Sequence, residues 1–247
     1  MSVKSKVFAA AATLTLVGGA GVAALTTAGA ANAATPSCGH HCIDIFSHQF
    51  GTFANPQFVM DSFKQGDVAG TQVILFRTSN ADPAEDFQTD NDGLVSEFYA
   101  LGLVSPGVEL HFGCTTAVEG TCDAKAGQVD DYAYEFMYTP YGVDTGLCVG
   151  VAATAVNGEH VTLQPCGVSS KTLWISDSHT GQLTAHAEPL INGSDTNFSD
   201  PYGLTYGQDS YPTDTPRPPL YTQTVLGFTN HAINSNQEWS ADEGVLP

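Results

Sequence analysis

The segment from Tyr134 to Trp174 is the part of the sequence that most constrains the fold. It begins with aromatic residues at alternate positions, and two further apolar runs follow at 147–151 and 161–163. Pro, Gly and Asn residues separate these runs, with an Asn-Gly pair at 157–158. Alternating aromatic and β-branched residues between such turn residues predict strands. The segment therefore predicts a unit of four short strands that closes on one large aromatic side chain, Trp174.

The spacing of this unit recurs on both sides of it. From Gly70 to Leu75 is five residues, as is the interval from Gly158 to Leu163, and Phe87 occupies the position of the closing aromatic in the first copy. A stretched third copy contains a Pro-rich insertion and ends on a second tryptophan. Such repetition predicts three copies of one structural unit. Their approximate bounds are 42–92, 132–178 and 187–242, with an insertion at 93–131.

The insertion has a less regular pattern. Residues 94–104 fit either a short helix or a strand followed by a turn, and 108–112 is predicted as a strand. The run Asp90–Gly93 resembles part of a calcium-binding loop because of its acidic residues. If Gly93 takes the glycine position of such a loop, however, two required oxygen ligands are missing, so a turn is expected.

The first 33 residues have the pattern of a secretory signal peptide. Lysines at positions 4 and 6 precede an Ala/Val/Leu-rich run, which ends in Ala-Asn-Ala at 31–33. The alternative is a membrane anchor, since the run is nearly long enough to span a bilayer. Its Gly and Thr content and its Ala-x-Ala end favour cleavage, which would leave residues 34–247 as a single secreted, extracellular domain.

The chain is strongly acidic. After loss of the two signal lysines, five Lys and Arg would face 26 Asp and Glu. Such a surface repels phosphate backbones and anionic lipids, so neither nucleic acid nor a membrane surface is expected as a partner. A soluble monomer is expected.

The six cysteines all follow the expected cleavage point, and an even number in an exported chain predicts disulfides. Fifteen pairings are possible, and the spacing favours the local set Cys38–Cys42, Cys114–Cys122 and Cys148–Cys166. The alternative for Cys38-Gly-His-His-Cys42 is metal binding. The exported context favours a disulfide, and no metal or cofactor is expected.

Three four-strand units cannot bury their apolar faces singly, but they can do so together around a pseudo-threefold axis, closing a barrel. The expected fold is an all-β β-trefoil. The sequence also resembles the ricin-type β-trefoil lectins with the Gln-x-Trp signature, through residues 146–151, 161–166 and 236–239. It also resembles a group of exported bacterial proteins, and this second resemblance implies no activity.

The resemblance implies a shallow sugar pocket in each unit. In that family an Asp on the second strand accepts sugar hydroxyls, an aromatic side chain stacks on the sugar, and an Asn/Gln pair completes the contacts. No unit of this chain keeps the whole set, and unit 2 has Gly150 in place of the Asp. The candidate carbohydrate-binding residues are Asp61 and Phe76 in unit 1, and Tyr221, Asn236 and Gln237 in unit 3.

Alternatively, the closing aromatics plug the core and the Asn/Gln pair satisfies backbone groups. No pattern typical of a zinc hydrolase, a serine hydrolase or a phosphate loop occurs, so a non-catalytic binding protein is expected. Its ligand is either a carbohydrate, such as a cell-wall polysaccharide, or an extracellular protein. In the second case the long loops at 114–131 and 207–219 would make the contact, as in trefoil protease inhibitors.

Overall fold

The computed structural model divides the chain into two compact parts, Met1–Ala33 and Ala34–Pro247. The structure describes ten segments of residues 34–247, and the predicted signal peptide lies outside the described residues. Within the described residues, no helix has the length and apolar character needed to cross a membrane. The described residues are 42–52, 55–79, 82–113, 117–118, 121–122, 130–167, 169–176, 188–206, 219–225 and 234–241.

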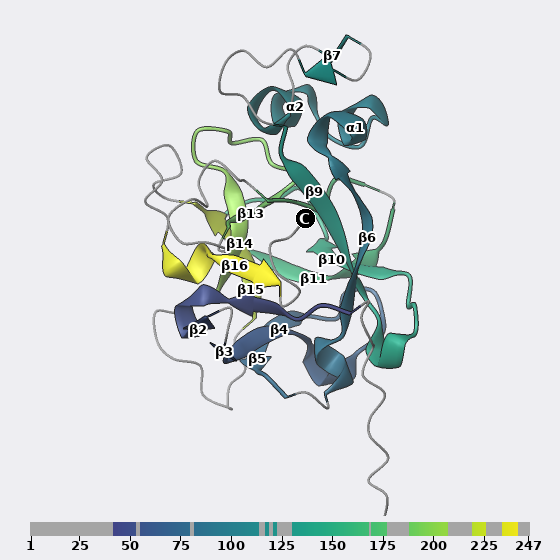
Figure 1. Cartoon of the computed structure of the whole chain (residues 1–247), viewed down its shortest axis with the longest axis vertical. Coiled ribbons are helices and arrows are strands. Elements are labelled where there is room, and N and C mark those ends of the chain that lie inside the picture. The colour runs from purple at the N-terminus through teal and green to yellow at the C-terminus, as the bar shows by residue number, and fades with distance from the viewer. Residues whose placement is uncertain are drawn as a thin grey trace, which may run out of the picture. The chain divides into compact units, whose positions relative to one another are not determined.

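The described part of the chain consists mainly of short strands, with two short α-helices (Figure 1). The helices are α1 (Val95–Ala100) and α2 (Pro106–Phe112). The strands are β1 (Ile45–Ser47), β2 (Gly51–Thr52), β3 (Asn55–Pro56), β4 (Phe58–Ser62), β5 (Val73–Arg77), β6 (Phe87–Leu94), β7 (Ala117–Val118), β8 (Thr121–Cys122), β9 (Tyr132–Tyr138), β10 (Leu147–Val151), β11 (Glu159–Pro165), β12 (Leu173–Ser176), β13 (Leu190–Asn192), β14 (Tyr202–Tyr206), β15 (Leu220–Thr224) and β16 (Trp239–Ala241).

Six strands form a closed ring, two from each unit. Strands β6, β9, β12 and β13 are successive neighbours, and β16 pairs with β1. Two isolated bridges complete the ring: Ile43 with Phe87 joins β1 to β6, and Glu188 with Trp239 joins β13 to β16. Closure leaves no free sheet edge in this ring.

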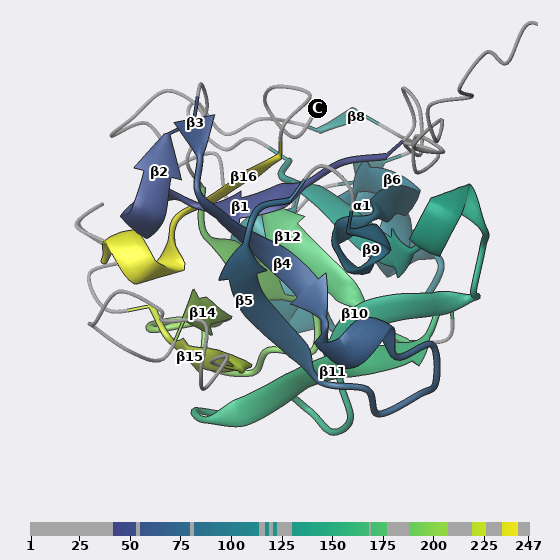
Figure 2. The same ribbon diagram turned by 90° about the horizontal axis from the view of Figure 1, so that it is seen from below.

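The remaining strands of the units form three hairpins, β4–β5, β10–β11 and β14–β15, which lie together on the side seen in Figure 2. They contact one another in a cycle. Strand β11 pairs with β15, and bridges from Gln72 to Thr162 and from Ile74 to Pro219 connect β5 to the other two hairpins. A six-strand ring capped by three linked hairpins is a β-trefoil-like fold, so the prediction of an all-β trefoil is confirmed at this level.

The closing aromatics lie in the core at equivalent places. Phe87, Trp174 and Trp239 are each at most 1% exposed and belong to one hydrophobic cluster. The indole nitrogen of Trp174 donates to the carbonyl of Val149 (2.9 Å), and that of Trp239 donates to the carbonyl of Leu204 (2.9 Å). These bonds fix the register between units: position 149 in unit 2 corresponds to 204 in unit 3.

The insertion between units 1 and 2 contains the two helices, and here one prediction is wrong. Residues 108–112 belong to helix α2 and not to a strand. The side chain of Ser105 caps this helix by accepting from the Val108 amide (3.2 Å), and Pro106 occupies its first turn. Both are helix-start signals that the apolar alternation obscures. Residues 95–100 form α1, the helical one of the two alternatives for that segment.

The helices cover the outside of the barrel. Along β12, Trp174 points into the main core while its neighbours Leu173 and Ile175 belong to a second hydrophobic cluster, because successive strand side chains face opposite ways. The insertion therefore buries an apolar outer face of the barrel. The second cluster consists of Val95, Phe98, Val104, Val108, Phe112, Ala133, Leu173, Ile175, Ile191 and Val225.

Candidate functional site

The trefoil repeat defines one comparable position in each unit. In unit 2 this position is Gly150, which follows the residue whose carbonyl accepts from Trp174. In unit 3 it is Thr205, which follows the residue whose carbonyl accepts from Trp239. The predicted alignment places Asp61 at the corresponding point of β4 in unit 1. The residues two before the closing aromatics are Glu85, Thr172 and Gln237. In the ricin-type resemblance these two positions hold sugar-binding residues.

In units 2 and 3 the protein's own atoms occupy this position. The amide of Gln237 donates to the hydroxyl of Thr205 (2.9 Å), and both side chains are at most 2% exposed. In unit 2 a Cβ added to Gly150 would lie 2.7 Å from the carbonyl oxygen of Lys171 and 2.9 Å from the Thr172 methyl. A side chain at position 150 therefore has no room.

This crowding gives a testable consequence for Gly150→Ala. Because the nearest atom belongs to the backbone, which cannot rotate away, we expect the free energy of unfolding to fall by about 1–3 kcal/mol. Urea unfolding followed by tryptophan fluorescence would measure the loss. Unchanged stability would mean that unit 2 has space at this position. Gly70→Ala is a poor control because a φ of +88° is strained for alanine. Ala152→Gly, on the connection between β10 and β11, exchanges the same two residue types at a position outside the strands and serves as the control.

Unit 1 differs because its position holds carboxyl groups. Oxygens of Asp61, Asp82 and Glu85 all lie within 4.8 Å of one another. Asp61 is 1% exposed and Glu85 is 2% exposed, so a sugar could not reach the Asp61 carboxyl without a rearrangement. The backbone amide of Ser79 donates to both oxygens of Glu85 (3.0 Å each).

The Glu85 carboxyl is the most strongly perturbed of this group. Burial raises the pKa of Glu85 to about 9, although the Ser79 hydrogen bond opposes the shift and the charges of Asp44, Asp82 and Asp61 add to it. Glu85 therefore holds a proton at neutral pH. A protonated carboxyl can donate one hydrogen bond, as the amide of Gln237 does at the same position of unit 3.

The other candidate sugar-binding residues are spread over the hairpins and the closing turn. Phe76 pairs with Val59 and lies on the same face of the β4–β5 hairpin as Asp61. Tyr221 packs on the His160 ring of unit 2 (4.6 Å between centroids). The side-chain amide of Asn236 donates to the carbonyl of Tyr206 (2.9 Å). The structure brings Asp61 and Phe76 to one face, and it gives the Asn236 and Gln237 amides hydrogen-bond partners within the protein.

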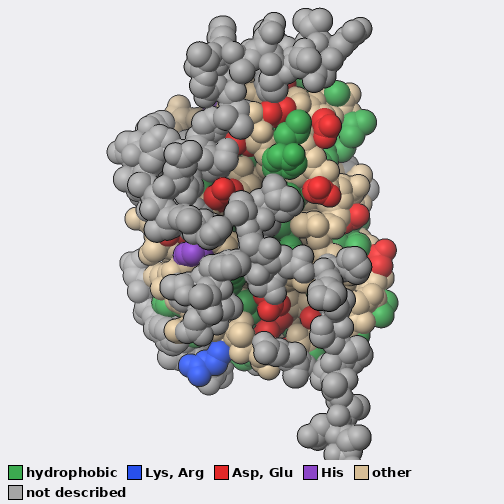
Figure 3. Space-filling view, in the orientation of Figure 1, with side chains coloured by type: hydrophobic (Ala, Val, Ile, Leu, Met, Phe, Trp, Pro, Cys, Tyr) green, Lys and Arg blue, Asp and Glu red, His purple; other side chains and the backbone are tan. Residues whose placement is uncertain are grey.

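A pocket of about 110 Å³ lies elsewhere, between the insertion and unit 2; we call it the seam pocket. Its apolar wall comes mainly from the insertion, and its polar wall comes from β6, β9 and the connection between β11 and β12. Leu101 is 72% exposed at its rim. In Figure 3 hydrophobic and acidic side chains lie side by side over the insertion helices. The lining residues are Asn91, Phe98, Leu101, Leu103, Glu135, Gly167, Ser169 and Leu173.

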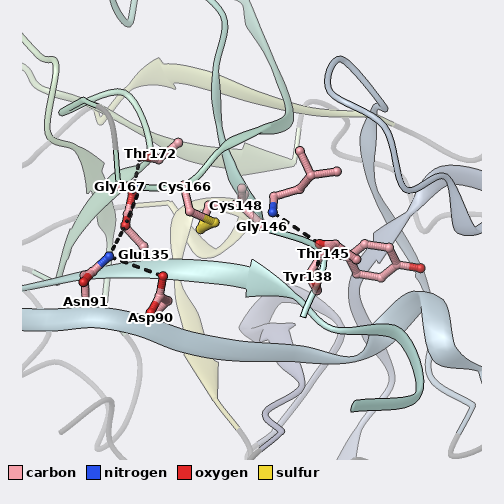
Figure 4. The surroundings of a disulfide bond; sticks show 12 residues. Asp90, Asn91, Glu135, Tyr138, Thr145, Gly146, Cys148, Cys166, Gly167 and Thr172 are labelled. Atoms are coloured by element: carbon pink, nitrogen blue, oxygen red, sulfur yellow. Dashed lines mark hydrogen bonds between the residues drawn. A yellow bond between two sulfur atoms is a disulfide. The ribbon is translucent and has the colours of Figure 1, made fainter. Parts of the chain in front are cut away.

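The Glu135 carboxylate holds the polar wall together (Figure 4). It accepts hydrogen bonds from the Asn91 amide (2.7 Å), from the Gly167 backbone amide (2.9 and 3.0 Å) and from the Thr172 hydroxyl. Two of these contacts are N–H groups donating to the carboxyl oxygens, and the Thr172 hydroxyl also lies 3.0 Å from the carbonyl oxygen of Ser169. Glu135 is 2% exposed, and its contacts tie β6, β9 and the β11–β12 connection into one rigid wall.

Two local features place the donors around Glu135. The β6–β9 register shifts between Asp90 and Gly93, and Asn91 there has a φ of +48°. The segment predicted as a turn is therefore a bulge within a strand, which turns the Asn91 amide toward Glu135. On the other side the Cys148–Cys166 disulfide, whose prediction is confirmed, directly precedes Gly167.

The other predicted disulfides lie partly or wholly outside the residues whose side chains the structure describes. Cys42 is disulfide-bonded. The pairs Cys38–Cys42 and Cys114–Cys122 stay predictions, because positions 38 and 114 and the side chain of Cys122 are outside that part.

Comparison with known proteins supports the fold without naming a family. Neither a protein-family model nor a curated protein sequence matches the chain. Among solved structures, an exo-β-1,3-galactanase from Clostridium thermocellum aligns with a TM-score of 0.50 at 8% identity, over 82% of this chain and 30% of that chain. At this identity the likeness shows the fold alone, and this chain spans less than a third of the galactanase.

Two further structures align less well. The designed threefold-symmetric protein ThreeFoil gives a TM-score of 0.49 at 10% identity, over 81% of this chain and 96% of that one. A mosquitocidal holotoxin gives 0.45 at 11% identity, over 81% and 17%. The assignment of a trefoil-like fold therefore stands on the strand pairing of this chain.

The seam pocket was not predicted from the sequence. Glu135 lies in an alternating strand where its polar character indicates only an outward-facing position. The usable signals were the insertion itself, which breaks the repeat, and the run of four polar residues at 89–92 inside a strand. Neither indicates that a helix from the insertion would wall a pocket beside Glu135.

Proposed function

We propose that the chain is an exported, non-catalytic carbohydrate-binding domain, and that it binds sugar in the seam pocket. The observation that carries the proposal is the composition of this pocket, with an apolar wall facing a polar one. A sugar ring has an apolar face and a rim of hydroxyls, so it fits between walls of these two kinds.

The polar wall offers suitable partners for hydroxyls. The amide nitrogen of Asn91 donates to Glu135, and its side-chain carbonyl oxygen is an acceptor that a sugar hydroxyl could use. Ser169 contributes a hydroxyl that accepts from the Lys171 amide (3.3 Å) and can itself donate. Phe98, Leu103 and Leu173 supply the apolar surface opposite. The buried acidic trio of unit 1 supports no catalytic proposal, because Asp61 and Glu85 are almost inaccessible.

The test is isothermal titration with neutral oligosaccharides of β-1,3-galactan, cellulose and chitin. Galactan is included because the aligned galactanase acts on it by name. We expect heat from at least one of the three. No heat with any of them, at protein and sugar concentrations that detect millimolar affinity, would contradict the proposal.

A matched pair of variants tests where the sugar binds. Leu101→Ala removes an exposed side chain that lines the pocket, whereas Leu110→Ala removes one on α2, 56% exposed, that does not line it. Because covering a leucine side chain contributes about 1–2 kcal/mol, we expect Leu101→Ala to weaken binding roughly five- to thirtyfold. Equal affinities for the two variants would place the sugar elsewhere.

A protein ligand is the second candidate. The insertion exposes Tyr99, Leu101 and Leu110, which are 41%, 72% and 56% accessible, and such apolar side chains are typical anchors of protein contacts. A protein partner that saturates the chain in the absence of glycan, with affinity lost in both leucine variants, would favour this candidate over the lectin.

A further inference from the structure

The polar wall of the seam pocket contains an acidic residue, Glu135, and among the described residues no cationic side chain is paired with it. The groups that contact the Glu135 carboxyl are an amide, a backbone N–H and a hydroxyl, and none of them carries a positive charge. None of the eight lining residues is a lysine or arginine. The nearby Lys171 directs its ammonium to the carbonyl of Ala152 (3.1 Å), on the β10–β11 connection.

A second carboxyl group lies close to Glu135. Asp90 lies opposite Glu135 in the β6–β9 pair, and the Asn91 amide reaches both carboxylates, at 3.3 Å and 2.7 Å (Figure 4). Burial raises the pKa of Asp90, and the negative charges of Glu135 and Asp144 raise it further. A ligand that contacts Asn91 in the seam pocket would therefore lie close to two acidic side chains.

Two requirements on a ligand follow. Carboxylate, phosphate or sulfate groups on a sugar would be repelled, and a cationic group would be attracted, because a half-enclosed site screens charge less than water does. The ligand must also keep an apolar face for Phe98, Leu103 and Leu173. A free amino group on a sugar ring meets both requirements, since its ammonium has three N–H donors and the ring keeps its apolar face.

We propose that the seam pocket selects amino sugars with a free amine, of the glucosamine class, over their N-acetylated counterparts. The inference rests on the proposed function and deepens it. The ammonium would contact the side chains of Asn91 and Ser169, with the buried Glu135 carboxyl group behind Asn91 and the ring against the apolar wall. N-acetylation removes the charge and adds bulk, which a pocket of about 110 Å³ has little room for.

The test compares two trimers by isothermal titration at pH 6.5 and low salt, where sugar amines are largely protonated. We expect triglucosamine to bind at least tenfold more tightly than tri-N-acetylglucosamine. Adding 0.5 M NaCl should reduce that preference to threefold or less, because salt screens the charge contribution. Equal binding of the trimers, or tighter binding of the acetylated one, would overturn this inference while leaving the proposed function in place.

A charge variant separates electrostatics from shape. Asp90→Asn removes one acidic group near Glu135 without substituting a lining residue, and its amide oxygen can still accept from Asn91. We expect it to weaken triglucosamine binding roughly three- to tenfold and to leave tri-N-acetylglucosamine binding unchanged. Asp67→Asn, on the exposed β4–β5 connection, is the control for net charge and should change neither affinity. An equal effect of the two variants would overturn the inference. Absence of heat with both trimers and with the neutral panel would instead overturn the proposed function.

Discussion

Replacing Trp174 with alanine is expected to lower the free energy of unfolding by about 3–5 kcal/mol, enough to unfold much of a marginally stable domain. Trp174 is fully buried in the main cluster, and its indole nitrogen donates to the carbonyl of Val149. Truncation therefore leaves a large cavity between strands of the ring and the β10–β11 hairpin. Urea unfolding followed by far-ultraviolet circular dichroism measures the loss.

The graded control is Trp174→Phe, which gives unit 2 the closing aromatic of unit 1. Phe87 is fully buried at the equivalent place, so a phenyl ring fits this environment. The variant loses the bond to Val149 and some volume, and we expect a loss of about 1–2 kcal/mol. If the alanine variant lost no more than the phenylalanine variant, Trp174 would not be a shared core plug and the threefold account would be contradicted.

Replacing Glu85 with glutamine is expected to stabilise the protein at pH 7.5 by about 1–3 kcal/mol. Glutamine occupies the same position in unit 3, where Gln237 donates to Thr205, and it keeps an acceptor for the Ser79 amide. It also removes a carboxyl group whose ionisation is unfavourable in the folded protein, first because it is buried and then because Asp44, Asp82 and Asp61 lie near it.

The pH dependence gives the sign of this effect. The pKa of Glu85 rises from 4.5 to about 9 on folding, so between these values the folded state binds more protons than the unfolded state. The contribution of Glu85 to the free energy of unfolding is most favourable below pH 4.5, and this contribution is lost as the pH rises through about 9. Wild type should therefore lose stability over this range, and Glu85→Gln should lose less.

Denaturant titrations at pH 5, 7 and 9 measure how steeply the free energy of unfolding changes with pH in wild type and in Glu85→Gln. Glu159→Gln makes the same substitution on a half-exposed side chain of β11 and should keep the wild-type slope. A Glu85→Gln profile parallel to that of wild type would show that Glu85 ionises normally in the folded protein.

The parts of the fold that the sequence predicts well are those with local signatures. Turn residues bound β10 so clearly that its predicted limits match, and the spacing of Cys148 and Cys166 identified their disulfide. The sequence pattern does not predict helix α2, because apolar and polar residues alternate from Val108 to Phe112 as in a strand, and this pattern conflicts with the helix-start signals Ser105 and Pro106. Short segments with both patterns are decided by packing, here against the outer face of β12.

The candidate site was much harder to predict. A family resemblance directs attention to Asp61, Asn236 and Gln237, and the sequence cannot show that Asp61 is buried or that the two amides donate within the protein. The seam pocket depends on contacts between residues far apart in the chain, such as Asn91 with Glu135 and Glu135 with Gly167. Spacing within a single sequence carries no signal for such contacts.

The most direct test of the account is to map bound sugar onto the backbone amides by NMR. The central claim is that ligand binds at the seam pocket and not at the sugar positions of the trefoil units. Titration with triglucosamine should shift the amide signals of Asn91, Phe98, Leu103 and Ser169, which line the pocket. Shifts confined to the surroundings of Asp61 and Phe76, or of Asn236 and Gln237, would contradict the claim.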